Sequence, residues 1–134
     1  MKMSLISSDT KDWTVLIVDD EPDNVNVAQK VLTYNGAVVH VARNGVEGLK
    51  MLEQVHPTFI LLDLSMPEMD GWEMLNQARK LPEWGKVPII ALTAHAMAGD
   101  KERVLNAGFN GYIAKPFRIG TFLDDIKACL RDFS

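Results

Sequence analysis

Five short apolar segments alternate with five amphipathic segments along this chain, and that alternation constrains its fold more than any other feature. The apolar segments are rich in branched side chains and too short for core helices, which is typical of strands buried on both faces. Regular strand–helix alternation predicts an α/β fold whose parallel sheet is covered by helices on both faces. The expected strands span residues 14–18, 37–41, 58–62, 89–92 and 111–114.

Helix signals occupy the segments between these strands. Pro22 suits the first position of a helix, Gly36 suits the residue beyond a helix end, and Asn44 is a good N-cap. The expected helices start at Pro22 and end near Asn35, run from the Asn44 cap to about residue 55, and span residues 72–81, 99–107 and 119–132. We expect residues 1–12 to form an N-terminal tail and residues 13–134 to form one domain.

The composition supports a single globular domain and argues against several functions. The 134 residues are 47% apolar and 24% charged, and the net charge of −4 argues against a dedicated nucleic-acid binder. The lone Cys129 permits no internal disulfide, which fits a reducing cytosol. The first eleven residues show no signal-peptide pattern, and no apolar run is long enough to span a membrane. A cytoplasmic protein without nucleic-acid or membrane partners is expected.

Polar residues follow four of the predicted strands directly. Asp19 and Asp20 come after the first strand, Asp63 after the third, Thr93 after the fourth and Lys115 after the fifth. Right-handed crossovers place the carboxyl ends of all strands at one edge of the sheet, where open α/β folds bind ligands. Structural roles remain as alternatives: capping or loop acids, an N-cap threonine and a solvated surface lysine. Their joint position favours one site.

The residue types at this edge indicate phosphoryl chemistry. Three neighbouring carboxylates repel one another, and an all-oxygen set with few protein ligands suits Mg²⁺ better than Ca²⁺. Asp63 could act as a carboxylate nucleophile that accepts a phosphoryl group, while the Lys115 ammonium and the Thr93 hydroxyl would bind the phosphoryl oxygens. Small Ala94 would leave room for the phosphate, and a cis bond before Pro116 is a plausible way to aim Lys115 inward.

These residues resemble the response-regulator receiver domains of two-component signalling, over about residues 14–132. The similarity lies in Val18-Asp19-Asp20-Glu21, in Leu62-Asp63-Leu64-Ser65-Met66-Pro67 with Asp70-Gly71, in Leu92-Thr93-Ala94, and in Gly111-Tyr112-Ile113-Ala114-Lys115-Pro116-Phe117. Each piece is weak alone, but together, in order and at the ends of the right strands, they are highly specific. The resemblance implies a flavodoxin-like, doubly wound sheet of five strands in the order 2-1-3-4-5, with five helices.

The resemblance also implies a site. Asp63 would accept phosphate from a histidine kinase or a histidine phosphotransfer protein. Mg²⁺ would be held by Asp20 and Asp63 and by the backbone carbonyl of Ser65, with help from Asp19. The phosphoryl group would bind Thr93 and Lys115, and Tyr112 would be the aromatic residue that turns inward as the threonine moves toward the phosphate. A downstream protein would bind the fourth helix, fifth strand and fifth helix.

Two positions are less usual for such a domain. Ser65 stands two residues after the expected acceptor, and His95 stands two residues after Thr93. Both would flank the phosphoryl group and affect the access of water to it. We expect the lifetime of the aspartyl phosphate to depend on them.

Several other functions remain as alternatives to a stand-alone phosphorylated switch. The chain could be a receiver module from a hybrid histidine kinase, or a binding module that is never phosphorylated. A phosphatase of the haloacid dehalogenase type is disfavoured, because its Asp-x-Asp motif is expected after the first strand. The glycine-rich motifs of P-loop nucleotidases and dinucleotide-binding oxidoreductases are absent. The sequence does not identify the kinase, target or oligomeric state.

Overall fold

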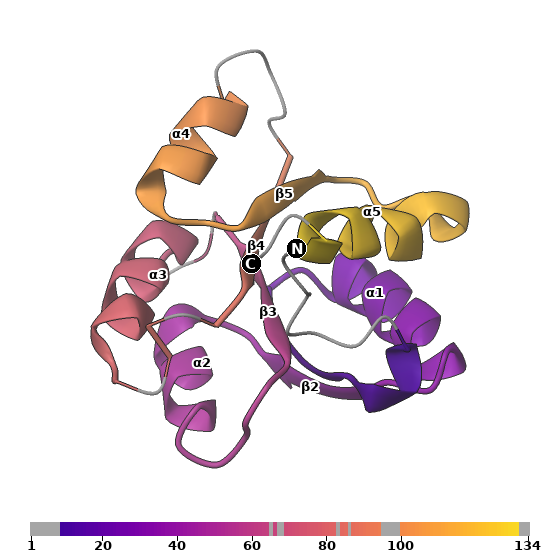
Figure 1. Ribbon diagram of the computed structural model, residues 1–134, viewed down its shortest axis with the longest axis horizontal. Coiled ribbons are helices and arrows are strands. Elements are labelled where there is room, and N and C mark those ends of the chain that lie inside the picture. The colour runs from indigo at the N-terminus through magenta and orange to yellow at the C-terminus, as the bar shows by residue number, and fades with distance from the viewer. Residues whose placement is uncertain are drawn as a thin grey trace, which may run out of the picture.

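The apolar segments assemble into one parallel sheet in the computed structural model of the chain (Figure 1). The structure describes residues 9–64, 66, 69–82, 84–85, 87–94 and 100–131. The five strands run in the order β2-β1-β3-β4-β5, and every neighbouring pair is parallel. The predicted α/β class and strand order are confirmed. The strands are β1 (Thr14–Val18), β2 (Val38–Ala42), β3 (Phe59–Asp63), β4 (Ile89–Thr93) and β5 (Gly111–Ala114).

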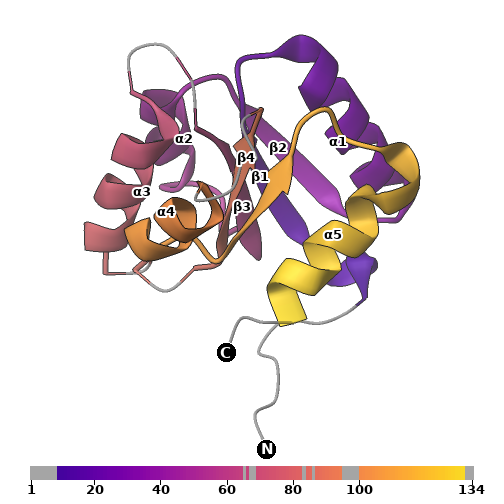
Figure 2. The same ribbon diagram turned by 90° about the horizontal axis from the view of Figure 1, so that it is seen from above.

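The helices lie on both faces of this sheet (Figure 2). Helices α2, α3 and α4 cover one face, and α1 and α5 cover the other. A 3-10 turn (Thr10–Asp12), in which Thr10 is buried, precedes β1. The helices are α1 (Pro22–Tyr34), α2 (Gly45–Met51), α3 (Gly71–Lys80), α4 (Asp100–Ala107) and α5 (Ile119–Arg131).

The two helical layers explain why the central strand β3 has apolar side chains on both faces. In β3, Ile60 and Leu62 pack toward the α2–α3–α4 layer, while Phe59 and Leu61 pack toward the α1–α5 layer. All four side chains are fully buried. Successive residues of a strand point to opposite faces, so a strand between two helical layers must be apolar at every position.

Most elements begin and end within one residue of the sequence-based boundaries; α2 differs by more, and a one-residue difference in β3 changes the place of Asp63. Helix α2 ends at Met51 rather than near residue 55, because the chain tightens into turns in which Glu53 bonds to Lys50 and Gln54 bonds to Met51. Pro57 disfavours helical backbone at the residue before it and limits the helix from that side. Strand β3 extends through Asp63, which is therefore the last residue of the sheet rather than the first residue of a loop.

Candidate metal and phosphoryl site

Three carboxylates meet at the carboxyl edge of β1 and β3. One oxygen from each of Asp19, Asp20 and Asp63 lies within 4.8 Å of the others. Asp19 and Asp63 are buried, with exposed fractions of 1% and 4%, while Asp20 is exposed. The acids end neighbouring strands of a parallel pair, so the sheet itself brings them together. The three carboxylates therefore lie close enough to one another to bind a single ion.

Lys115 reaches this cluster from the end of β5. Its Nζ atom lies 3.0 Å from Oδ2 of Asp19 and 3.2 Å from Oδ1 of Asp63. The side chain is only 8% exposed, and the Lys115–Pro116 peptide bond is cis. Lys115 is therefore a nearly buried ammonium that bridges two buried carboxylates, rather than a solvated surface lysine.

The charges around Lys115 decide its protonation state. Burial lowers the pKa of the ammonium, but its hydrogen bonds and attraction to Asp19, together with those to Asp63, outweigh that effect and raise the pKa above its ordinary value. A raised lysine pKa means that the ammonium loses its charge only in strongly alkaline solution. Lys115 is thus a fixed positive charge throughout the neutral range.

A cavity of about 380 Å³ opens beside Asp63. Asp20, Thr93, Ala94 and Lys115 line it together with Asp63. Thr93 is buried at the end of β4, and small Ala94 follows it on the surface. The cavity therefore combines a carboxylate, a hydroxyl and an ammonium around one space, which is the arrangement that phosphoryl oxygens and a hard cation require.

Gly71 is a positioning residue at this site, although the sequence assigned it no role beyond its place in a motif of the family. A Cβ atom at Gly71 would lie 2.2 Å from the carbonyl oxygen of Asp63, so only glycine allows α3 to begin against the end of β3. The preceding Asp70 caps α3 by accepting a hydrogen bond from the backbone N–H of Glu73. The resemblance included the Asp70-Gly71 pair, but the close contact of Gly71 with Asp63 was not predicted.

Glu21 is a second residue whose place near the site was missed. Its Oε2 atom lies 3.9 Å from Nζ of Lys115, and its backbone N–H donates to Oδ1 of Asp19. The first contact is long and the glutamate side chain is 59% exposed, so it contributes little energy. The second contact fixes the orientation of the buried Asp19 carboxylate.

The remaining predicted residues lie at or beyond the margin of this site. Tyr112 is half-buried on β5 and packs against the α2–α3–α4 layer. Cys129 is half-buried on α5, with its Sγ atom 4.0 Å from the Tyr112 carbonyl oxygen. Ser65 and His95 lie outside the described residues, so the structure places neither the predicted carbonyl ligand nor the histidine.

The carboxylate cluster fits a divalent cation. Its ligand atoms are all oxygens, they lie close enough to share one ion, and a cation would relieve repulsion that one ammonium only partly offsets. Asp19, Asp20 and Asp63 would hold the ion. A bound Mg²⁺ would supply positive charge at the mouth of the cavity, where an incoming phosphate would otherwise meet three acids.

The fold and this edge together define a class of protein. A five-stranded flavodoxin-like sheet with an acid cluster, a hydroxyl and a lysine at its carboxyl edge is the architecture of a CheY-type signalling domain. The family model for the response regulator receiver domain matches residues 15–127. The chain belongs to the response regulator receiver family of two-component signalling.

Similar proteins agree with this assignment. The polar-differentiation response regulator DivK of Brucella ovis is 34% identical over 119 residues, which cover 89% of this chain and 97% of DivK. The chemotaxis response regulator CheY4 of Vibrio cholerae is 28% identical, with a TM-score of 0.81 and coverage of 87% and 97% of the two chains. The receiver domain of the sensor histidine kinase PA1611 from Pseudomonas aeruginosa is 33% identical, with a TM-score of 0.77 and coverage of 90% and 96%.

The structure of the PA1611 receiver domain holds a magnesium ion in its active-site cleft.

Within the part of this chain that the structure describes, no helix has the length and apolar character needed to cross a bilayer.

Proposed function

We propose that this domain accepts a phosphoryl group on Asp63, in a reaction that depends on Mg²⁺. The observation that carries the proposal is the position of the Asp63 carboxylate. It is buried at the end of β3, lies 3.2 Å from the Lys115 ammonium, shares a cation-sized cluster with two other acids and opens into a cavity lined by Thr93. A capping or loop acid would need none of these partners.

The proposed donor is the phosphohistidine of a histidine kinase or a histidine phosphotransfer protein. One Asp63 carboxylate oxygen forms a bond to phosphorus, while the P–N bond of the donor breaks and its electron pair returns to the imidazole nitrogen. Thr93 and Lys115 bind the phosphoryl oxygens, so Lys115 exchanges part of its pairing with Asp63 for the phosphate. Asp20 and Asp63 hold the metal, with Asp19 assisting and the Ser65 carbonyl as a further ligand.

The proposed output is a conformational switch. Thr93 is the last residue of β4 and pairs with Ala114 of β5. Tyr112 stands two residues before Ala114 on the same strand. Movement of the Thr93 hydroxyl toward a phosphate would change the space beside β5, and the inward turn of Tyr112 would fill it. A target protein would then recognise the altered face formed by α4, β5 and α5. In this role the domain is a switch that assists its own phosphorylation and dephosphorylation, not an enzyme with an independent substrate.

Two kinds of chain could contain such a domain. A free-standing regulator is supported by DivK, which the similarity covers almost completely. A module of a hybrid kinase is supported by the PA1611 receiver domain, which comes from a sensor histidine kinase. We propose the free-standing regulator as the first candidate and the hybrid-kinase module as the second, acting in the cytoplasm in either case.

Phosphoramidate, a small P–N donor, tests the proposed reaction. The purified protein is incubated with phosphoramidate and Mg²⁺, and its intact mass is measured with and without EDTA. We expect a phosphoryl adduct that needs Mg²⁺ and is absent in Asp63→Asn. An adduct that persists in Asp63→Asn, or no adduct on wild type despite measured Mg²⁺ binding, would overturn the proposal.

A further inference from the structure

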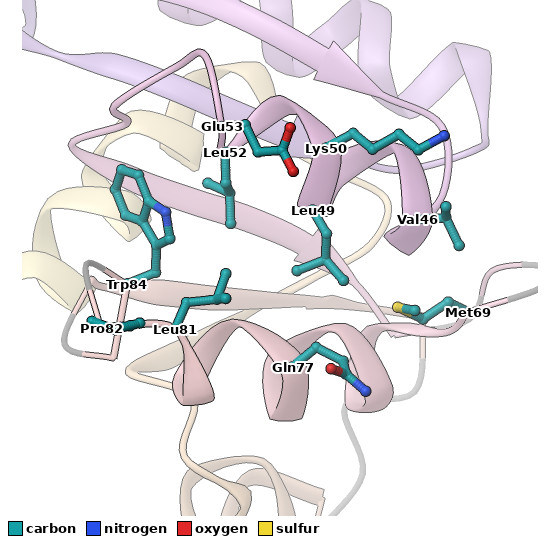
Figure 3. A pocket seen from close by; sticks show the side chains of 10 residues that line it. All are labelled: Val46, Leu49, Lys50, Leu52, Glu53, Met69, Gln77, Leu81, Pro82 and Trp84. Atoms are coloured by element: carbon teal, nitrogen blue, oxygen red, sulfur yellow. The ribbon is translucent and has the colours of Figure 1, made fainter.

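A second cavity, separate from the one beside Asp63, lies between α2 and α3 (Figure 3). Its volume is about 640 Å³, larger than the cavity beside Asp63 and within the range of small-molecule pockets, roughly 300–1,000 Å³. Apolar side chains from both helices and the segments that follow them form most of its wall: Val46, Leu49, Leu52, Met69, Leu81, Pro82 and Trp84. The proposed function uses none of these residues.

This cavity keeps apolar surface in contact with solvent. Val46 and Leu81 are each 38% exposed, and both belong to the few large apolar side chains of the described chain that are exposed at all. Leu52 and Trp84 form the deeper part and are almost fully buried. Binding of an apolar ligand would therefore be favourable, because the ligand would remove Val46 and Leu81 from water and pack against the buried Leu52 and Trp84.

The indole of Trp84 supplies a polar feature that points to a ligand. Trp84 is 8% exposed, and no described residue accepts a hydrogen bond from its Nε1–H, a donor that solvent still reaches. The Trp84 ring contacts the His56 ring, and the two ring centroids lie 5.5 Å apart. Figure 3 shows the indole nitrogen on the side of the ring that faces Leu52 and Leu81 across the cavity. An acceptor on a ligand in the cavity would replace the water that now reaches this donor.

The charges at the rim limit what that acceptor can be. Glu53 follows Leu52 and lies at the Trp84 end of α2, whereas Lys50 extends toward Val46 at the other end (Figure 3). Neither side chain has an ion-pair partner among the residues that the structure describes. A carboxylate placed against Trp84 would approach Glu53 and be repelled, so a neutral carbonyl oxygen is the better acceptor.

We propose that this cavity binds a small, neutral, mostly apolar molecule whose carbonyl oxygen accepts a hydrogen bond from the Trp84 indole. A single small molecule fits the volume, whereas a stable protein interface would need a larger surface, about 800 Å² per partner. The ligand would also contact Met69, in the segment that follows Asp63. The Met69 carbonyl accepts a hydrogen bond from the Gly45 backbone N–H, 3.3 Å away, so this segment is already joined to α2.

N-benzylacetamide is a suitable probe, because it joins an aromatic ring to one neutral amide carbonyl. We would record ¹H–¹⁵N spectra of the full chain during titration, with 3-phenylpropionate as a carboxylate of similar size. The Trp84 indole signal is assigned by its loss in Trp84→Phe. The amide is expected to shift this signal saturably while the buried Trp13 indole stays in place, and the carboxylate is expected to bind several-fold more weakly.

Trp84→Phe retains the ring and removes the donor, so it should weaken amide binding roughly threefold to tenfold, the range that one hydrogen bond accounts for. Leu49→Glu, in the wall of the cavity, should abolish binding, and Ile119→Ser, at an exposed apolar residue of α5, should leave it unchanged. The spectra report whether each variant is folded. The proposal is wrong if the amide causes no saturable shift of Trp84, if the carboxylate binds equally well, or if Trp84→Phe retains full affinity.

Discussion

Lys115 sets the charge balance of the site at the scale of single residues. Its ammonium lies 3.0 Å from Asp19 and 3.2 Å from Asp63, so it offsets part of the repulsion among three acids. A divalent cation would compete with this ammonium for the same carboxylates. The residue that is proposed to bind phosphate therefore also limits how tightly the resting site holds a metal.

Replacement of Lys115 by methionine should consequently tighten Mg²⁺ binding. The variant retains most of the apolar stem and removes one positive charge beside the cluster, so we expect the dissociation constant to fall on the order of tenfold, which corresponds to about 1.4 kcal/mol. Isothermal titration with MgCl₂ measures this change. Lys30→Met on exposed α1 is the matched control and should bind Mg²⁺ like wild type. Weaker binding in Lys115→Met would contradict this account of the charge balance.

At the scale of elements, the start of α3 fixes the end of β3. The absence of a side chain at Gly71 lets the helix begin against the Asp63 carbonyl. The Gly71 N–H donates to the Leu64 carbonyl oxygen at 3.3 Å, which closes the turn. The acid at the end of the strand is thus held by the helix that follows it.

Gly71→Ala should destabilise the fold by about 1–3 kcal/mol, the usual cost of forcing an extra carbon into a packed site. Its Cβ would meet backbone atoms of Asp63 and Leu64, which cannot move without disturbing β3. Gly120→Ala in α5 is the matched control, because a Cβ atom added at Gly120 would meet no heavy atom within 4 Å. That variant should gain up to about 1 kcal/mol from helix propensity. Urea unfolding measures both, and equal stability of the two variants would count against the role of Gly71.

Arg79 joins elements at the opposite edge of the sheet. From α3, its guanidinium donates to the carbonyl oxygens of Val87 and Gly108 at 2.6 and 3.0 Å, and to Oδ1 of Asn110 at 2.8 Å. Asn110 Oδ1 also accepts from the Ile89 N–H at 2.8 Å. One side chain therefore connects the entry to β4, the end of α4 and the entry to β5.

Arg79→Met should lower the free energy of unfolding by about 1–3 kcal/mol, because partly buried acceptors lose their donor. Arg79→Lys should recover little, since an ammonium cannot reproduce the forked geometry of a guanidinium. Chemical denaturation gives both values, with exposed Lys80→Met as a neighbouring control that should stay within about 0.5 kcal/mol of wild type. A loss of similar size in Lys80→Met would show that the effect does not come from the hydrogen bonds.

Most helix and strand boundaries could be predicted from the sequence, because particular residues mark them through local backbone preferences. Pro22, Gly36 and Asn44 act locally, and all three mark helix ends that the structure contains. The end of α2 was missed because its apolar pattern continues into Leu52, which is buried although it lies in a turn. The Arg79 contacts join segments far apart in the chain and leave no local pattern.

At the scale of the whole molecule, the parallel sheet brings the site together. Asp19, Asp63, Thr93 and Lys115 come from four strands and meet only because all strands run the same way. Strand ends are readable from sequence, so the membership of this cluster could be predicted. The detailed geometry of the cluster could not be predicted, because it depends on side-chain packing across strands. This geometry includes the Lys115 bridge, the burial of Asp63 and the backbone contact of Glu21.

A site assembled by the fold should in turn stabilise the fold when it is filled. Binding of Mg²⁺ to the native state alone should raise the free energy of unfolding by about 2.7 kcal/mol at a concentration one hundred times its dissociation constant. Asp63→Asn should show a much smaller gain and, because one repelling carboxylate is lost, a higher stability without metal. Urea unfolding with and without MgCl₂, at matched ionic strength with NaCl, measures both effects. An equal gain in the two proteins would place the metal elsewhere.

The most direct test of the central claim is to identify the residue that carries the phosphoryl group. The protein is treated with phosphoramidate and Mg²⁺, reduced with borohydride, which converts an aspartyl phosphate to homoserine, and digested for mass spectrometry. We predict homoserine at position 63 and none at positions 19 or 20. Homoserine at either of those two positions, or in no peptide of a protein that has gained phosphate, would contradict the assignment of Asp63 as the acceptor.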